Sequence, residues 1–201
     1  MIGEATFAGE VLVGLNAEVA QLRRGDPNAL AELLARYQNR LYRYLLRLVR
    51  DPATAEDLFQ QTWLRVAQTI RQFDPRHNFE AWLFRVARNL AIDHLRRYRP
   101  ESLDEPLPSG DLPGERVPST DPDAFHALLA GERARRVARA LDALPAIHRE
   151  VLTLRFEEEM KLEEIAEVLG TPLSTVKSRL RRALDSLRER LLAQLPEREW
   201  Q

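Results

Sequence analysis

An acidic, proline-rich stretch between residues 100 and 122 is the feature that most constrains how this chain of 201 residues can fold. Six of the 12 prolines lie in it, and each proline removes a backbone donor and disfavours helix at the preceding residue. Residues 100–130 carry seven acidic side chains and one basic side chain, whereas residues 1–99 carry 15 basic and 11 acidic ones. The stretch is therefore predicted to be a tether, and the net charge of -1 conceals an acidic linker between two more basic halves.

Both halves are predicted to be helical, because apolar residues recur every three or four positions. In the first half, Asp-Pro pairs precede helices that start near residues 27 and 52, and a third helix is predicted over residues 78–98. In the second half, helices are predicted over residues 162–169 and 173–191. The predicted fold class is all-α, with two small helical domains at 1–99 and 130–201 joined by a flexible acidic linker at 100–129.

Composition argues against several classes of function. No stretch free of charged residues approaches the roughly 18 residues of a membrane span, so no membrane insertion is expected. The absence of cysteine excludes disulfides and thiolate chemistry and, with an opening segment that lacks a basic leader, favours a cytoplasmic protein. The four histidines lack metal-ligand spacing, and the Glu157–Glu159 cluster is expected to be a solvated acidic surface. We therefore expect no enzyme activity, no metal, no cofactor and no small-molecule substrate.

The strongest local signal is a helix-turn-helix pattern, in which Gly170-Thr171-Pro172 joins the two predicted helices of the second half. On the second helix one stripe is predicted to be buried: Val176, Leu180, Ala183, Leu184, Leu187 and Leu191. The outward set near the helix start is Ser174, Thr175, Lys177, Ser178, Arg181 and Arg182. Small polar and basic residues at a helix start favour insertion into a DNA major groove. The alternative is an amphipathic helical hairpin with a solvated arginine face.

The predicted helix over residues 78–98 offers a second nucleic-acid surface. One sector of it contains Arg85, Arg88, Asn89, Ile92, Arg96 and Arg99. Aromatic residues flank this sector, namely Phe73, Phe79, Trp82 and Tyr98. Arginines that hold phosphates and rings that stack on bases are the two requirements of single-stranded DNA binding. The alternative is that the rings belong to the core and the arginines are simply solvated.

Six sequence strings resemble the bacterial extracytoplasmic-function sigma factors. In the first half these are Gly25-Asp26-Pro27, AEDLFQQTW (55–63) and WLFRVARNLAIDHLRR (82–97). In the second half they are LPAIHREVLTLRF (144–156), EEIAEVLG (163–170) and STVKSRLRRAL (174–184). Members of this family are dissociable promoter-specificity subunits of RNA polymerase. The resemblance implies that core RNA polymerase and promoter DNA are partners, and that an anti-sigma factor is a further one.

The resemblance also implies roles for individual residues. The core polymerase would contact Asp57, Gln60 and Gln61, with Leu58 and Leu64 packed inward; Gln61 stands where the family usually has an acidic residue. The loop 74–80 and the helix after it would capture a flipped base of the -10 element and hold the melted strand, through Phe79, Trp82, Arg85, Arg88, Asn89, Arg96 and Arg97. The -35 duplex would be bound by Arg155, Ser174, Thr175, Lys177, Ser178, Arg181 and Arg182.

Two further expectations concern the whole chain. The acidic linker would run toward the RNA path of the polymerase, or would simply remain soluble and open. The alternative function is a stand-alone, dimeric helix-turn-helix transcriptional regulator whose first half senses a signal or dimerises. Such a regulator would need only duplex DNA, usually with a palindromic site, whereas a sigma factor requires core polymerase.

Overall fold

The structure is a computed structural model that describes Leu15 and residues 17–98 and 134–194. Over these residues every regular element is helical, which confirms the all-α prediction. The linker at 100–129 lies outside the described residues. The elements are α2 (Pro27–Val49), α3 (Pro52–Thr69), the 3₁₀ turn η1 (Ile70–Gln72), α4 (Phe79–Tyr98), α6 (Ala146–Leu152), the π turn η2 (Thr153–Glu157), α7 (Leu162–Leu169) and α8 (Leu173–Ala193).

The described residues form two compact units. The first contains α2, α3, η1 and α4, and residues 163–171 of the α7 segment group with it. The second contains α6, η2 and α8, together with a helical stretch at 134–142. No helix in the described parts of the chain is both long enough and apolar enough to cross a membrane.

Asp-Pro pairs start the first two long helices, as their sequence predicts. The Asp26 carboxylate accepts a hydrogen bond from the Asn28 backbone N–H at 2.9 Å, and Asp51 accepts one from the Thr54 N–H at 2.8 Å. In both helices a proline occupies the first turn, where its missing N–H removes no helical hydrogen bond. The hydroxyl of Thr54 also donates to Asp51, and these hydrogen bonds lower the pKa of the Asp51 carboxyl.

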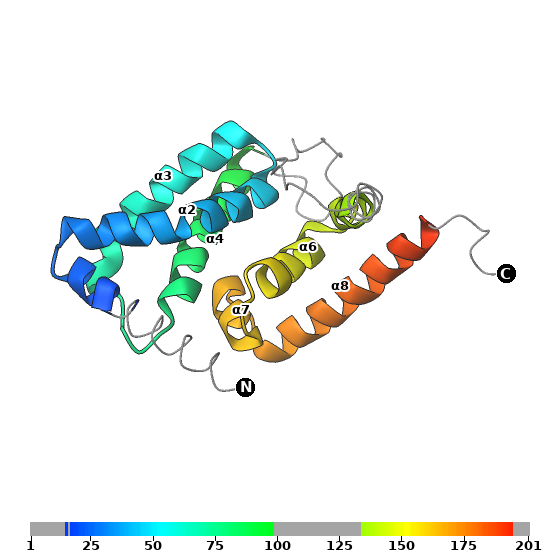
Figure 1. The fold of residues 1–201 in the computed structure, drawn as a ribbon. Coiled ribbons are helices and arrows are strands. Elements are labelled where there is room, and N and C mark those ends of the chain that lie inside the picture. The colour runs from blue at the N-terminus through cyan, green and yellow to red at the C-terminus, as the bar shows by residue number, and fades with distance from the viewer. Residues whose placement is uncertain (1–14, 16, 99–133, 195–201) are drawn as a thin grey trace, which may run out of the picture. The chain divides into compact units, whose positions relative to one another are not determined.

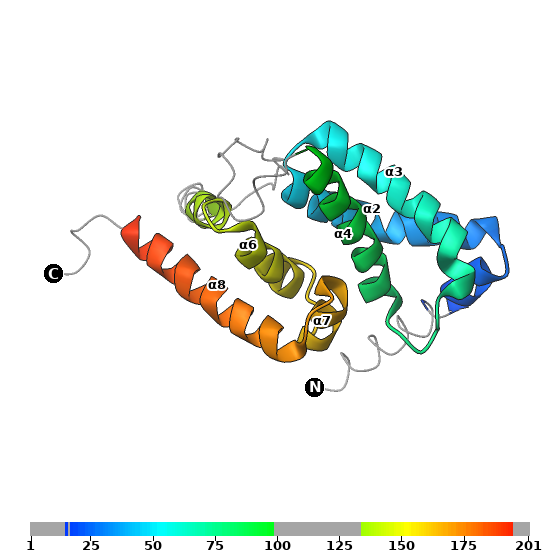
Figure 2. The ribbon, with the colours of Figure 1, turned by 180° about the vertical axis from the view of Figure 1, so that it is seen from behind.

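The first unit is a three-helix core in which α2, α3 and α4 pack together (Figures 1 and 2). The rings of Tyr44 on α2 and Phe84 on α4 lie 5.1 Å apart, and both are essentially inaccessible to solvent. The side of α2 that faces the core is apolar: Leu33, Tyr37, Leu41, Tyr44 and Leu45 are buried, and Leu30, Leu34 and Leu48 are half-buried.

The expectation that Leu64 packs inward with Leu58 is wrong. Leu58 is 3% exposed, whereas Leu64 is 62% exposed and its neighbour Trp63 is 5% exposed. The reason lies in helix geometry: six residues at about 100° each put Leu64 about 120° around the helix from Leu58. Trp63, not Leu64, supplies the apolar bulk that α3 buries.

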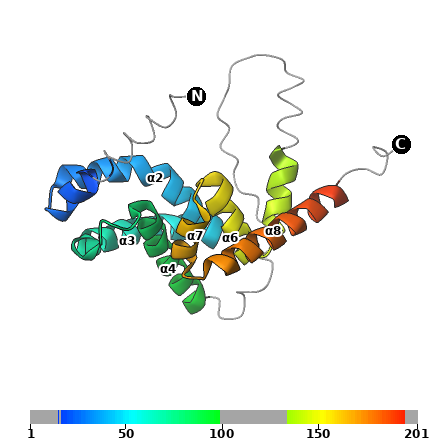
Figure 3. The ribbon, with the colours of Figure 1, turned by 90° about the horizontal axis from the view of Figure 1, so that it is seen from below.

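The second unit is built on α6 packed along α8 (Figure 3). The predicted stripe on α8 buries Val176 and Ala183 completely, and Leu180, Leu187 and Leu191 are half-buried. Leu184 is 40% exposed, so its prediction as a buried residue is wrong. It lies about 80° around the helix from Val176, at the edge of the stripe.

The acidic cluster Glu157–Glu159 at the end of η2 is not uniformly solvated, contrary to the expectation. Glu157 and Glu159 are exposed, but Glu158 is only 4% exposed. The Glu158 N–H donates to the Thr153 carbonyl at 3.0 Å, a π-type bond, and Glu159 adopts a left-handed backbone with φ 55°. This widened turn redirects the chain and rotates Glu158 inward.

Candidate nucleic-acid interface

Side chains of α3, η1 and α4 line a pocket of about 520 Å³ within the first unit. Its volume falls within the roughly 300–1,000 Å³ typical of small-ligand sites. The lining combines two rings with cationic and amide groups and one carboxylate: Arg65, Thr69, Gln72, Phe73, Trp82, Arg85, Val86, Asn89, Leu90 and Asp93. The pocket can therefore offer stacking, hydrogen bonding and positive charge together.

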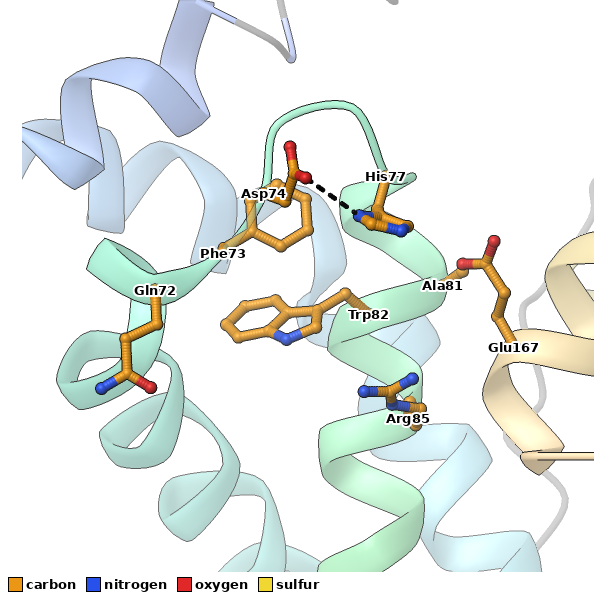
Figure 4. A pocket seen from close by; sticks show the side chains of 8 residues that line it. All are labelled: Gln72, Phe73, Asp74, His77, Ala81, Trp82, Arg85 and Glu167. Carbon is orange, nitrogen blue, oxygen red and sulfur yellow. Dashed lines mark ion pairs between the residues drawn. The ribbon is translucent and has the colours of Figure 1, made fainter.

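Trp82 is the accessible ring of a cluster of aromatic side chains. Its ring lies 5.1 Å from that of Phe73 (Figure 4) and 5.8 Å from that of Phe79. Phe73 and Phe79 are buried, at 5% and 3% exposure, whereas Trp82 is half-buried. Phe79 thus does not reach the surface that the sequence assigned to it, because it packs under Trp82. The two phenylalanines hold the indole in place, and the indole is the part of this aromatic cluster that solvent can reach.

The basic stripe predicted on α4 is partly assembled. Arg85, Asn89 and Arg96 are exposed and lie within about 40° of one another around the helix. Arg88 is half-buried, and Arg97 is exposed but lies about 120° around the helix from Arg85. The side chain of Tyr98 and all of Arg99 lie outside the described residues. The helix therefore presents three of the predicted polar groups on one side and Arg97 on another.

The loop that precedes α4 is held by its own polar side chains. The Asp74 carboxylate accepts hydrogen bonds from the Arg76 backbone N–H at 3.0 Å and from the Arg76 guanidinium at 2.7 Å. The guanidinium hydrogen bonds are the main reason that the pKa of Asp74 falls to about 2. His77 Nδ1 lies 3.9 Å from Asp74 (Figure 4). At the other end of the loop, Asn78 Oδ1 caps α4 by accepting from the Glu80 N–H at 2.8 Å.

Glu80 fastens the first turn of α4 to α2. Its carboxylate accepts a hydrogen bond from the Arg40 guanidinium at 2.5 Å and one from the Tyr37 hydroxyl at 3.3 Å. Burial, and then the charge of Glu80, raise the pKa of the Tyr37 hydroxyl, so it remains a donor. The sequence analysis missed this positioning role of Glu80. Its two partners lie 40 and 43 positions away in the chain, and no sequence pattern predicts contacts over such separations.

The exposed side of α3 carries the residues expected to contact polymerase. Asp57, Gln60 and Gln61 are all exposed. Leu64 lies among them, at about 20°, 40° and 60° around the helix from these three residues respectively. A large apolar side chain thus sits within an otherwise polar face, and the sequence analysis missed it by assigning Leu64 to the core. A helical-wheel comparison of Leu64 with Leu58 could have found it.

The turn between α7 and α8 has a sharp, glycine-dependent geometry. The Thr171 N–H donates to the Ala166 carbonyl at 3.1 Å, and the Gly170 N–H donates to the Glu167 carbonyl at 3.4 Å. This pair of bonds is the Schellman arrangement, and Gly170 takes the left-handed conformation that it requires, with φ 61°. The predicted Gly-Thr-Pro turn therefore stops α7 within one residue and allows α8 to start at Leu173.

The exposed face at the start of α8 matches the predicted set closely. Ser174, Lys177, Ser178, Arg181 and Arg182 are exposed and Thr175 is half-buried. The Ser178 hydroxyl donates to the Thr175 carbonyl at 2.9 Å, which fixes its orientation. Arg155, expected near the DNA backbone, is half-buried and donates to the Met160 carbonyl at 2.9 Å. One N–H group of the Arg155 guanidinium therefore stabilises the turn after η2.

A metal site finds no support in the described segments, because they contain no group of three or more His, Asp or Glu side chains that could hold an ion. The chemistry that these surfaces do offer is cationic, aromatic and hydrogen-bonding. Such groups can bind polyanions and bases.

Comparisons with known proteins match both halves. The family described as Sigma-70 region 2 matches residues 33–101, and the family described as Sigma-70, region 4 matches residues 140–189. The ECF RNA polymerase sigma factor SigE of Mycolicibacterium smegmatis is 35% identical over 173 residues, covering 83% of this chain and 64% of SigE. The ECF sigma factor RpoE of Cereibacter sphaeroides is 32% identical over 167 residues, covering 83% of this chain and 88% of RpoE.

Two solved structures of sigma factors are similar to this chain in both sequence and fold. CnrH, in complex with the cytosolic domain of CnrY, is 27% identical, with a TM-score of 0.65, and the match covers 90% of this chain and 98% of CnrH. RpoE of Bartonella quintana, in complex with the anti-sigma factor NepR, is 25% identical, with a TM-score of 0.64, and the match covers 82% and 98% of the two chains.

Helical regions of these two kinds in one chain define a DNA-binding transcription initiation factor of the sigma-70 type. Since ECF sigma factors of 30% identity or more match over most of their length, the chain belongs to the ECF RNA polymerase sigma factors. The resemblance seen in the sequence is thereby confirmed. The alternative of a stand-alone dimeric helix-turn-helix regulator is not favoured.

Proposed function

We propose that this sigma factor opens and holds the -10 element with residues 1–99, binds the -35 duplex with residues 130–201, and contacts core polymerase through α3. The observation that carries the proposal is the pocket between η1 and α4, in which a half-buried Trp82 stands beside the exposed Arg85 and Asn89. The two surfaces belong to separate units, as separate DNA elements require.

The pocket of the first unit suits an extruded base. Removing a base from its stack costs a few kcal/mol, which ring and amide contacts must offset. Trp82 supplies the ring, Asn89 an amide and Arg85 a cation for the adjacent phosphate. The hydrogen bonds of Asp74 and Glu80 support this proposal, because they hold the loop that follows Phe73 and the first turn of α4, just before Trp82, in place before DNA arrives. Arg88, Arg96 and Arg97 are proposed to hold neighbouring phosphates.

The exposed start of α8 suits a major groove. Lys177, Arg181 and Arg182 can reach base edges or phosphates, and Ser174 and Ser178 add short polar contacts. Thr175 and Arg155 are proposed to lie near the DNA backbone. Phosphate contacts would position the helix, and base contacts would select the sequence.

The polymerase contact is proposed on the face of α3 formed by Asp57, Gln60 and Gln61, with Leu64 as its apolar anchor. Interfaces commonly combine one buried apolar anchor with a polar rim. Bartonella quintana RpoE is solved with an anti-sigma factor, and we extend this kind of partner to the present chain. In this proposal the protein is cytoplasmic, is not an enzyme, and uses no cofactor or small-molecule substrate.

Reconstituted transcription tests the proposal. Core polymerase with and without the full chain is assayed on a library of linear promoter templates, and promoter-selective initiation is expected only with the chain. Arg182→Ala should lower the salt dependence of promoter binding by about one phosphate equivalent, or relax the preferred -35 sequence if it reads a base. Arg188→Ala is the matched control, since Arg188 is exposed on the same helix about 120° around from Arg182. The proposal would be refuted if promoter-selective initiation did not appear with the chain, or if initiation were equally selective without it.

A further inference from the structure

The pocket between α3 and α4 extends well beyond Trp82. Both Trp82 and Asp93 line it, and the residues of α4 between them span about 16 Å along the helix. The helices α3 and α4 run side by side in opposite directions (Figure 2), and Phe73, just after α3, contacts Trp82. Arg65, about two turns before Phe73, therefore lies toward the Asp93 end of the pocket. The proposed function uses the Trp82 end and leaves the Asp93 end without a role.

The two charged side chains at the Asp93 end are available to a ligand. Arg65 and Asp93 are both exposed, and neither side chain forms an ion pair or a hydrogen bond within the described part of the chain. On α4, Asp93 lies about 40° around the helix from Asn89 and about 80° from Arg85, so it continues the polar side that these two residues begin. One group that only donates hydrogen bonds and one that only accepts them thus line the same pocket.

The carboxylate of Asp93 determines which part of a DNA strand this end can bind. The phosphate and sugar oxygens of the strand offer no N–H group, and a phosphate is repelled by a carboxylate. Only the bases present N–H donors to which a carboxylate can be hydrogen-bonded. A subsite that contains Asp93 therefore suits a base and not the backbone.

Guanine is the base whose edges match both side chains. Its N7 and O6 accept two hydrogen bonds from an arginine, and its N1–H and N2 amino group can donate to a carboxylate. Thymine has two carbonyl oxygens on either side of a single N–H, so it matches a carboxylate least well. In a melted strand both edges of a base are accessible, because no partner base occupies them.

We propose that Arg65 and Asp93 form a second base-reading subsite of this pocket, and that the subsite selects guanine at a nucleotide near the one captured at Trp82. The inference rests on the proposed capture of the melted -10 strand by the first unit. It adds a residue of α3 to the DNA-binding surface. It also gives sequence selection to an acidic residue, whereas the sequence analysis considered only basic, amide and aromatic residues of α4.

The experiment uses holoenzyme formed from core polymerase and the full chain, with single-stranded oligonucleotides that carry the -10 element of a promoter from which it initiates. Each nucleotide of the element is varied in turn among the four bases, and affinity is measured by competition. At one position other than the captured base, wild type should bind guanine most tightly and thymine least. The difference should be roughly fivefold or more, the lower end of what one bidentate contact contributes.

Two altered bases assign the contacts to atoms. Inosine lacks the N2 amino group that Asp93 would bind, and 7-deazaguanine lacks the N7 that Arg65 would bind. Wild type should bind each of them several-fold more weakly than guanine. Asp93→Ala should no longer distinguish inosine from guanine, and Arg65→Ala should no longer distinguish 7-deazaguanine from guanine. Asp185→Ala and Arg71→Ala are the matched controls, since both residues are exposed and do not line the pocket, and both variants should retain the two distinctions.

The ratios between bases separate recognition from a loss of stability, because a less stable variant binds all bases more weakly by the same factor. Unchanged ratios in Asp93→Ala and Arg65→Ala would overturn the inference, as would a preference for a base other than guanine at the position that these residues affect. Selective binding of the -10 strand that depends on Trp82 but not on Asp93 would refute the inference alone. A wild-type holoenzyme that binds the -10 strand no better than an unrelated strand would refute the proposed function of the pocket, and the inference with it.

Discussion

The adjacent residues Trp63 and Leu64 should respond in opposite ways to truncation. Trp63 is 5% exposed and Leu64 is 62% exposed, although they are neighbours on one helix. Trp63→Ala removes a large buried side chain and should lower the free energy of unfolding by about 3–5 kcal/mol. Its indole N–H is buried and has no hydrogen-bond partner among the described residues, which favours the lower end of that range. Leu64→Ala should change stability by less than about 0.5 kcal/mol.

The effect on polymerase binding should be reversed. Fully burying a leucine stabilises a complex by about 1.5–3 kcal/mol, and the exposed part of Leu64 can contribute about 1–2 kcal/mol of this. Leu64→Ala should therefore weaken binding to core polymerase by about 5- to 30-fold. Leu192→Ala is the matched control, because Leu192 is also exposed, at 44%, but lies near the end of α8.

Urea unfolding followed by circular dichroism measures the first effect, and competition against a fluorescently labelled wild-type chain for core polymerase measures the second. A loss of several kcal/mol of stability in Leu64→Ala would contradict the packing of α3. Unchanged polymerase affinity in Leu64→Ala, or an equal loss in Leu192→Ala, would contradict the assignment of this face.

Three further predictions concern single residues. Asn78→Ala should lower the free energy of unfolding of the first unit by about 1 kcal/mol in urea titrations, and Asn78→Ser should restore part of it, because a serine hydroxyl can also cap α4. Trp82→Ala should weaken strand capture by about 1–3 kcal/mol, measured in holoenzyme by permanganate reactivity of the melted strand, whereas Trp82→Tyr should retain part of it. The lowered pKa of His148 means that the unfolded state binds a proton first, so stability should be fully present above about pH 6.5 and should decline as pH falls below it. The decline should be smaller in His148→Gln, and an equal decline would show that other groups cause it.

The ends of the elements could be predicted because their determinants are local. An aspartate followed by proline fixes a helix start through one carboxylate and one missing N–H, and both operate within four residues of chain. Asp26 and Asp51 act in this way. Gly170 ends α7 through an equally local feature, its left-handed backbone conformation. The family resemblance could be predicted for a related reason, since it depends on the order and spacing of short strings.

What the sequence could not predict depends on the direction in which each side chain points in three dimensions. Glu158 appeared solvated within a run of three acids, but a π turn rotates it inward. Glu80 is held by Tyr37 and Arg40 across two helices, and no periodicity links residues so far apart in the chain. Phe79 is of a residue type that can stack on a base, but it is buried beside Trp82 and is not available for stacking.

Exposure alone does not identify a binding residue, since single exposed leucines are common on protein surfaces. Leu64 and Leu192 are both exposed, and accessibility gives no reason to prefer one of them. Their surroundings separate them, because Leu64 lies within about 60° of three residues that the family resemblance assigns to polymerase. Trp82 is distinguished in the same way by the arginine and the amide that share its pocket. In both cases the sequence indicates which residue types could bind, and the structure shows which of them face the same side of a helix or pocket. The Leu64→Ala and Leu192→Ala variants test whether these two kinds of information together identify a binding residue, which neither does alone.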